Sequence, residues 1–234
     1  MFQNQQQEIP GQRHFFERLK SVETFAEAEK LAKPFPTETL LPELVKQAIV
    51  ERRQRYRTEK FKAMIFLLIG LFFLLTSYRV GKGLNYVQGG LYLFLGVLNF
   101  LVGPFPTKRA TLVANLLYAR LRGKHEAFYC PEIIRLLGAT RSRNDSALQA
   151  LRAWLFETLP YLIESDAKRL PEEVRGILRR WLRVRSTSNE EKVVLLLVLA
   201  SAGDTATLPL AQKLLKSSSA HVREAAQEAV GLLG

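Results

Sequence analysis

The residues that most often carry chemistry are few and far apart in this chain of 234 residues. Its three histidines are His14, His125 and His221, and its one cysteine is Cys130. Only His125, Glu126 and Cys130 lie near one another in the sequence, and their spacing matches no structural zinc pattern, which needs a second pair of ligands. A single cysteine also cannot form an internal disulfide. The sequence therefore predicts neither a metal site nor a disulfide framework.

The sequence also lacks the motifs of catalysis and cofactor binding. It has no G-x-S-x-G elbow to present a nucleophilic serine, no phosphate-binding P-loop and no G-x-G-x-x-G. Glycine-rich phosphate loops join a strand to a helix, and no segment shows the alternation that predicts a strand. We therefore expect no enzymatic activity, no catalytic residue and no cofactor.

Positive charge is concentrated in one part of the chain. The net charge is +12, and residues 51–124 hold 13 basic and two acidic side chains, whereas the regions on either side are nearly neutral. This excess surrounds two uncharged stretches, from Ala63 to Tyr78 and from Leu84 to Phe105. A basic protein often binds nucleic acid, but this placement is typical of the residues that flank membrane-crossing helices. It favours lipid headgroups over nucleic acid as the partner of these charges.

The two uncharged stretches predict a transmembrane helical hairpin over residues 61–105. The first span covers residues 61–78, about 27 Å of helix, and the second covers residues 84–103, about 30 Å. Because only RVGKG separates them, the two helices are expected to run antiparallel. The first length is at the lower limit for a bilayer, so a hairpin that dips into one leaflet is the alternative. The basic flanks disfavour a third arrangement, in which the hairpin is buried inside a helical protein.

Basic residues lie at both outer ends of the expected hairpin. Eight of them are expected at the membrane interface: Arg52, Arg53, Arg55, Arg57, Lys108, Arg109, Arg120 and Arg122. The connecting loop holds only Arg79 and Lys82. Because basic residues are retained on the cytoplasmic side, we expect an integral membrane protein with both termini in the cytoplasm. A bacterial inner membrane is the default, and an organelle membrane is the alternative.

One polar residue stands out inside the second span. Asn99 carries an amide that is costly in hydrocarbon unless it finds a hydrogen-bonding partner. It is expected either to join the two helices of the hairpin or to contact a neighbouring membrane subunit. No charged group lies in the middle of either span, and a conduction path or proton relay usually needs one. The hairpin is therefore expected to be an anchor rather than a transport pathway.

Helices are also predicted on both sides of the hairpin. Residues 1–11 are rich in glutamine and are expected to form a disordered lead-in. Residues 12–60 predict cytosolic helices, one over residues 12–33 and a second that begins near Thr39 and continues into the first span. Residues 107–124 predict an amphipathic helix with only basic charges, which lies on the membrane surface or docks on the next domain.

Six further helices are predicted in residues 131–234. They form three pairs: 131–138 with 146–164, 171–184 with 190–202, and 207–216 with 219–233. Asp145 and Asn189 are placed to cap two of them. Helix pairs that recur every 30 to 45 residues are typical of an α-solenoid. The expected fold is therefore all-α, with N-terminal helices, a transmembrane hairpin and a solenoid of about three helix pairs.

The last helix pair resembles a HEAT repeat. The resemblance rests on Asp204, Pro209, Leu214 and Leu215, followed by Val222, Arg223, Ala225, Ala226, Ala229 and Leu232. It is clearest over residues 204–234, because the two preceding pairs lack the Val-Arg-x-x-Ala-Ala pattern. The resemblance implies a curved, armadillo-like stack of helix pairs whose concave face binds protein partners.

A row of arginines is the last feature with a possible binding role. Arg175, Arg179 and Arg183 recur at every fourth residue and therefore share one helix face. One interpretation is a solvated outer face, partly balanced by Glu172 and Glu173. The other is a docking surface for an acidic protein, a lipid headgroup or nucleic acid.

These features predict an interaction protein. The leading hypothesis is a membrane-anchored scaffold, an accessory or assembly subunit of a larger membrane complex, whose partners are other proteins and membrane lipid. The alternative is a membrane-tethered binder of anionic lipid or nucleic acid that uses its basic surface. The lack of catalytic motifs and the solenoid pattern favour the scaffold.

Overall fold

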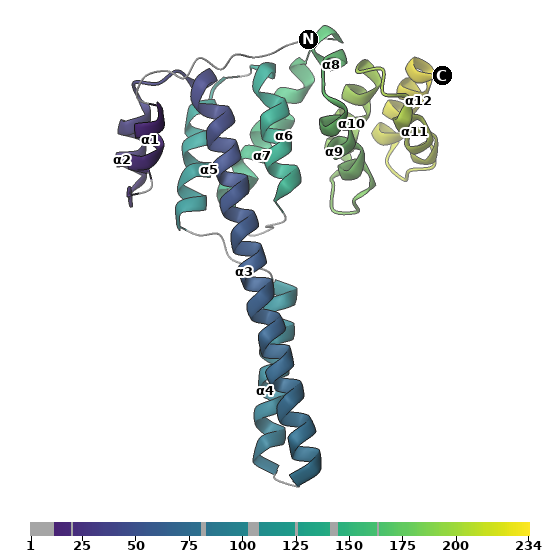
Figure 1. Ribbon diagram of the computed structural model, residues 1–234. Helices are drawn as coiled ribbons and strands as arrows, with labels where there is room; N and C mark the ends of the chain where they lie inside the picture. The colour runs from purple at the N-terminus through teal and green to yellow at the C-terminus, as the bar shows by residue number, and fades with distance from the viewer. Residues whose placement is uncertain are drawn as a thin grey trace.

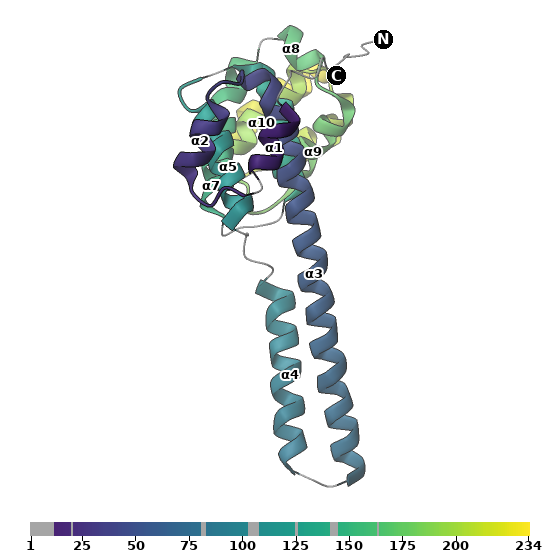
Figure 2. The same cartoon turned by 60° about the vertical axis from the view of Figure 1, so that its left-hand side comes forward.

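The architecture is a body of short helices from which one two-helix hairpin projects (Figure 1). The computed structural model describes residues 12–19, 21–80, 83–102, 108–124, 126–140, 145–162 and 164–234. Within these residues every regular element is a helix, which agrees with the expected all-α class. The hairpin stands well away from the body in both views (Figures 1 and 2).

One long helix belongs to both parts. The helix α3, Thr37–Val80, is 44 residues long and has no break between them. Its first third is buried in the body through Leu40, Leu41, Leu44 and Val45. Farther along, α3 leaves the body and runs beside α4, Gly83–Val102 (Figure 2). The predicted continuous helix from the body into the hairpin is therefore confirmed.

Glycines let the two hairpin helices approach closely. Gly70, Gly89 and Gly96 all lie at the contact between α3 and α4. A Cβ atom on Gly70 would lie 2.8 Å from the backbone nitrogen of Leu93, and one on Gly89 would lie 2.9 Å from the side chain of Leu74. Real Cβ atoms do not approach this closely, so a larger residue at these positions would force the helices apart. The small residues place helix backbone against helix backbone.

The predicted transmembrane hairpin is wrong. None of the helices in the described part of the chain, α3 and α4 included, combines the length and the apolar character that crossing a bilayer requires. The uncharged stretch of α3 covers only 16 residues, about 24 Å, and α4 mixes glycines and amides with its apolar residues. The predictions of an integral membrane protein with two cytoplasmic termini, and of a bacterial inner membrane, are corrected with it.

Two short helices precede α3. The expected single helix over residues 12–33 is divided into α1, Gln12–Leu19, and α2, Phe25–Ala32. The Ser21 hydroxyl donates a hydrogen bond of 2.8 Å to the carbonyl of Arg18 just after α1. Thr24 caps α2, because its side chain accepts a hydrogen bond from the backbone of Glu27. Such caps stabilise a helix start and divide the segment in two.

The centre of the body is built around the helix that follows the hairpin. This helix is α5, Lys108–Leu121, and it packs against α2, α3 and α7. Its residues Val113, Leu116, Leu117 and Leu121 are fully buried. The amphipathic helix expected over residues 107–124 therefore docks on the body, which was one of its two predicted locations. The turn η1, Ala127–Tyr129, leads into the next helix, α6, Cys130–Ala139.

The remaining helices are stacked in antiparallel pairs. They are α7 Ser146–Thr158, α8 Glu164–Lys168, α9 Glu172–Arg183, α10 Asn189–Ser201, α11 Leu208–Leu214 and α12 Ala220–Leu233, with 3-10 turns η2 Leu159–Tyr161 and η3 Thr205–Thr207. The helix α10 packs against both α9 and α12, and α12 packs against α11. Five of the six helices predicted beyond residue 130 lie within a few residues of their expected bounds, and the predicted segment 146–164 is divided among α7, η2 and the start of α8.

Glu191 connects two successive pairs of this stack. It belongs to the capping box of α10, in which the Ser188 hydroxyl accepts from the Glu191 backbone and the Ser188 backbone donates to the Glu191 carboxylate. The same carboxylate accepts two hydrogen bonds, of 2.7 and 2.9 Å, from Arg152 on α7. Burial alone would raise the pKa of Glu191, but the bonds from Arg152 and Ser188 outweigh it, and the pKa is lowered.

Arg52 fixes α3 to the body near the point where it leaves. Its guanidinium lies 2.6 Å from the carboxylate of Asp145, and the two side chains are only 9% and 1% exposed. Arg52 also donates to the carbonyl of Ala110 in α5. The second carboxylate oxygen of Asp145 accepts from the backbone of Ala147 and Leu148 and so caps α7, as the sequence predicts. The pair of Arg52 and Asp145 therefore joins three helices, α3, α5 and α7.

We expect Asp145→Ala to lower the free energy of unfolding by about 3 to 5 kcal/mol, because it leaves the buried Arg52 charge without its partner. Asp145→Asn should lose less, since the amide oxygen can still cap α7. Asp166, which is half-exposed and lies 4.0 Å from Arg169, provides the control, and Asp166→Asn should change stability by less than about 0.5 kcal/mol. Urea unfolding measures all three, and equal losses for Asp145→Ala and Asp166→Asn would contradict the role of the pair.

We expect Glu191→Gln to lower the free energy of unfolding at pH 7 by about 1 to 2 kcal/mol. Because the folded-state pKa of Glu191 is lowered from its ordinary value of 4.5, this stabilisation is complete above that value. It is then lost as the pH falls through the lowered pKa. Urea unfolding of the native chain and of Glu191→Gln at pH 7, 5 and 3 should show that the difference between their free energies of unfolding becomes smaller at pH 3. Glu157→Gln, on the exposed side of α7, is the control, and a difference that persists unchanged at pH 3 contradicts the assignment.

Candidate interaction surface

The residues that could do chemistry do not converge in the part of the chain that the structure describes. Among these residues, no group of three or more histidines, cysteines or carboxylates could hold a metal ion. Cys130 is buried, and burial raises the pKa of its thiol to about 12, so the thiolate is scarcely populated at neutral pH. His221 is exposed, with its Nδ1 3.8 Å from the carboxylate of Glu224, and the side chain of His125 lies outside the described residues. Surfaces, rather than pockets of reactive groups, are therefore the candidates for function.

Two of the three arginines in the predicted row are used inside the fold. The Arg175 guanidinium lies 3.0 Å from the carboxylate of Glu172 in the first turn of α9. Arg179 also contacts Glu172, and it lies 2.5 Å from Asp204 in the turn after α10. Hydrogen bonds to Glu172 and to Asp204 raise the pKa of Arg179 further. These two side chains are half-buried in ion pairs of the stack, whereas Arg183 is exposed.

Asp204 is the partner that the sequence pattern does not reveal. It is 3% exposed and lies 25 positions beyond Arg179 in the chain. Its second oxygen accepts a hydrogen bond of 2.6 Å from the hydroxyl of Thr207. Asp204 therefore orders the turn before α11 and holds it against α9. Its place in the HEAT-like pattern could have drawn attention to it, but only the folded stack identifies Arg179 as its partner.

The eight basic residues expected at a membrane interface take two different positions. Three of them bind within the body: Arg52 as described above, Arg109 with its Nε 2.8 Å from the Glu51 carboxylate, and Arg120 by donating to the carbonyl of Phe35. Four are exposed: Arg53, Arg57, Lys108 and Arg122. The side chain of Arg55 lies outside the described residues. Their interfacial role rested on spanning helices, and the described part of the chain has none.

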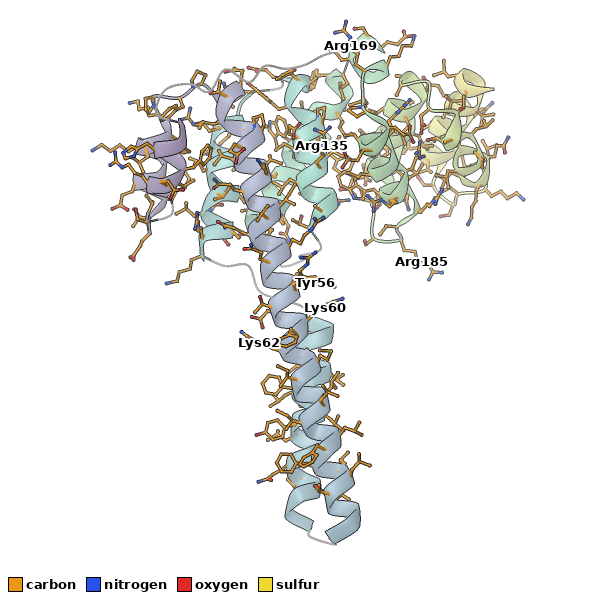
Figure 3. The ribbon with its side chains drawn as sticks, viewed as in Figure 1. Tyr56, Lys60, Lys62, Arg135, Arg169 and Arg185 are labelled. Carbon is orange, nitrogen blue, oxygen red and sulfur yellow. The ribbon has the colours of Figure 1, made fainter. Side chains whose placement is uncertain are left out.

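Five exposed basic residues lie near the base of the hairpin. We call them the basic collar, which consists of Arg53, Arg57, Lys60, Lys62 and Lys108. Figure 3 shows Tyr56, Lys60 and Lys62 on α3 where the helix leaves the body. The Lys60 ammonium lies 4.6 Å from the centre of the Tyr56 ring, and that of Lys62 lies 3.1 Å from the Glu59 carboxylate. Arg185, in the loop after α9, extends from the body on the same side (Figure 3).

Beyond the collar the hairpin exposes large apolar side chains. Thirteen of them are 38 to 71% exposed: Phe61, Met64, Ile65, Leu68, Leu71, Phe72, Leu75, Tyr86, Val87, Leu91, Phe94, Val97 and Leu98. Scattered apolar residues are normal on a protein surface, but an uninterrupted patch of this size marks an interaction site. The hairpin is therefore the main candidate interaction surface of the described chain.

The two broad sides of the hairpin differ. On one side the Tyr92 ring stacks between Phe66 and Phe73, with ring centres 6.2 and 5.8 Å apart. Residues two positions away along a helix point about 200° away, to the opposite side. That opposite side therefore carries Met64, Leu68, Leu71 and Leu75 from α3, and Gly90 and Phe94 from α4.

We call this second side the apolar face. One helical turn before Gly90 and two turns after it, Tyr86 and Val97 complete the face on α4. A Cβ atom on Gly90 would have no neighbour within 4 Å, so this glycine leaves an open notch rather than a packed contact. The side chain of Asn99 lies outside the described residues, although α4 includes its backbone. The expected contact of Asn99 therefore remains a prediction.

No family model, no curated protein and no solved structure matches the chain.

Proposed function

We propose that this chain is a protein-interaction scaffold in which the body holds the hairpin and the apolar surface of the hairpin binds other protein chains. The carrying observation is the row of large apolar side chains on α3 and α4 that nothing within the described chain covers. An uncovered apolar surface of this extent is unfavourable in water, and a partner that buries it gains roughly 25 cal/mol for each Å².

The body supports this proposal by the packing of its helix pairs and by the use of its charges. The pairs α6 with α7, α9 with α10, and α11 with α12 are packed on one another. Arg179, Asp204, Arg152 and Glu191 join neighbouring pairs through ion pairs. A HEAT-like stack, which the last pair resembles, presents extended surfaces to proteins through this kind of packing. The outward rows of the hairpin, with Phe72 on α3 and Val87 on α4, are the docking positions that we assign to other chains.

A second candidate function rests on the basic collar. Arg53, Arg57 and Lys108 are exposed, and no ion pair joins them to the described residues. A cluster of this kind binds polyanions such as nucleic acid or anionic lipid headgroups. This candidate ranks below the scaffold because the collar is small, whereas the apolar surface extends along the whole hairpin.

A photoreactive amino acid placed at Phe72 tests the scaffold in living cells. Phe72 is 62% exposed on the hairpin, and Leu232 is 61% exposed on α12, so the two positions are matched in exposure. We expect specific cross-links to other proteins from Phe72 and few from Leu232. Mass spectrometry identifies the products. The scaffold is contradicted if Phe72 gives no protein adduct, or if both positions give the same adducts.

The basic collar makes a separate prediction for the purified chain. If it binds polyanions, affinity for a single-stranded oligonucleotide or for anionic vesicles should fall by 10-fold or more between 50 and 200 mM salt, on the order that counterion release gives for a few contacts. Arg53→Ala with Arg57→Ala should remove most of this binding, whereas Arg180→Ala with Arg183→Ala, on α9, should not. Binding that is absent or indifferent to salt excludes this second candidate.

A further inference from the structure

We propose that the apolar face of the hairpin pairs with the same face of a second copy of this chain, and that the two hairpins run antiparallel as a four-helix bundle. This inference deepens the proposed function, because it names one partner of the hairpin. It leaves the outward rows, with Phe72 and Val87, free for other proteins.

The spacing of the apolar face on α3 makes it complementary to itself. Met64, Leu68, Leu71 and Leu75 follow one another at intervals of four, three and four residues, which is the spacing of a coiled-coil seam. The series reads the same in both directions. When two copies of α3 meet antiparallel across a two-fold axis, Met64 therefore faces Leu75 of the second copy, and Leu68 faces Leu71.

The face on α4 is complementary to itself, because it holds both an open notch and an exposed aromatic ring. Gly90 leaves an open notch, and Phe94, one helical turn farther along, is 63% exposed. In the same antiparallel arrangement α4 lies over α4 of the second copy. Near its centre, Phe94 of each copy then lies close to the notch at Gly90 of the other. A glycine opposite an aromatic ring permits the close approach that packed helices need.

The apolar area of the face approaches the area that a stable dimer buries. The seven side chains of the apolar face other than Gly90 are 44 to 63% exposed, and side chains of this size at half exposure present roughly 600 Å² in all. With the inner edges of the neighbouring rows, the total approaches the ~800 Å² per partner of stable protein complexes. The face holds no charged residue, so no unpaired charge is buried when two copies meet.

Charge decides the direction of pairing. A parallel pair of hairpins would bring the two basic collars together, with like charges next to each other. In the antiparallel pair, Lys60 lies about ten residues from the midpoint of the seam, so the two collars are about 28 Å apart. That separation exceeds the screening length of about 8 to 10 Å at ordinary salt. The antiparallel pair therefore avoids the contact between the two collars, and each collar of five basic residues meets only the two of the opposite connecting loop, Arg79 and Lys82.

The length of the projecting helix also permits this arrangement. Val80, at the end of α3, would lie beside residue 59 of the second copy, if the seam is centred between Leu68 and Leu71. The body of that copy begins near Arg52, where α3 contacts α5 and α7. Seven residues, about 10 Å of helix, remain between the tip of one hairpin and the body of the other. The two bodies then lie at opposite ends of the bundle.

The mass of the purified full chain in solution tests the pairing. Analytical ultracentrifugation over a range of concentrations should give twice the 26.6 kDa of one chain. Gly90→Trp should raise the dissociation constant on the order of 100-fold or more, because the new ring fills the notch between copies. It should leave the hairpin intact, since that space is open within the chain. Gly231→Trp is the matched control, because a Cβ atom there also meets nothing within 4 Å, and it should leave the dimer unchanged.

Cysteine cross-linking tests the direction of pairing. The native Cys130 is fully buried, so introduced cysteines are the reactive ones. A mixture of the Met64→Cys and Leu75→Cys chains should form disulfide-linked dimers under mild oxidation, and each chain alone should form few. Few disulfide-linked dimers in the mixture, at a concentration where the chain has twice its own mass, would overturn the antiparallel assignment.

Three results overturn the proposal. They are a chain that stays monomeric at every concentration, an assembly whose mass Gly90→Trp leaves unchanged, and flotation of the chain with phosphatidylcholine vesicles that abolishes the dimer. The last result would mean that lipid, not a second copy, covers the apolar face. The photo-cross-links from Phe72 are scored separately, so a monomer that still cross-links to other proteins refutes the pairing and leaves the scaffold intact.

Discussion

The structure depends on the continuity of α3. Because α3 continues as one helix from Thr37 to Val80, with Pro42 near its start as the one residue without a backbone donor, the direction of the hairpin is set by how the first third of the helix packs in the body. Leu40, Leu44 and Val45 are buried there, and the Arg52 ion pair with Asp145 holds the helix where it leaves. A flexible joint at this point would let the hairpin swing on the body. The buried ion pair and the continuous helix oppose such a joint and set the direction in which the hairpin leaves the body.

The close approach of the two helices inside the hairpin also explains why its outer surface is apolar. Gly70, Gly89 and Gly96 place the backbone of one helix against that of the other. Few large side chains therefore lie in the contact between α3 and α4. Phenylalanines and leucines that would otherwise fill an interhelical core are left to face outward. A hairpin of this kind buries little apolar area by itself, whereas ordering each of its residues opposes folding by about 1 to 2 kcal/mol. Its stability is therefore tied to whatever covers its outer surface.

Local sequence patterns predict the elements well and their partners poorly. The bounds of α4, α9 and α12, and the Asp145 cap, follow from helical periodicity and turn residues, which act within a few positions. The contacts of Arg179 with Asp204 and of Arg52 with Asp145 join residues 25 and 93 positions apart, and nothing near either arginine marks its acid. The absence of charge from Ala63 to Tyr78 of α3 and in α4 predicts a bilayer-crossing hairpin. That prediction is wrong because a run without charge is a weaker property than the length and hydropathy that crossing a bilayer requires.

The spacing of Met64, Leu68, Leu71 and Leu75 is visible in the sequence, but only the stacking of Tyr92 with Phe66 and Phe73 shows which side of the hairpin they share.

One physical criterion separates the structural residues of this protein from the candidates for binding. Arg175 and Arg179 have the spacing of a recognition surface, yet each already has a carboxylate partner in the described body. A partner molecule would have to break these pairs before it could bind there, and the charge that remained would be poorly solvated. The side chains of the apolar face have the opposite property, because water surrounds them and any apolar cover lowers their free energy. A face that is free of charge and reads the same in both directions is best covered by itself.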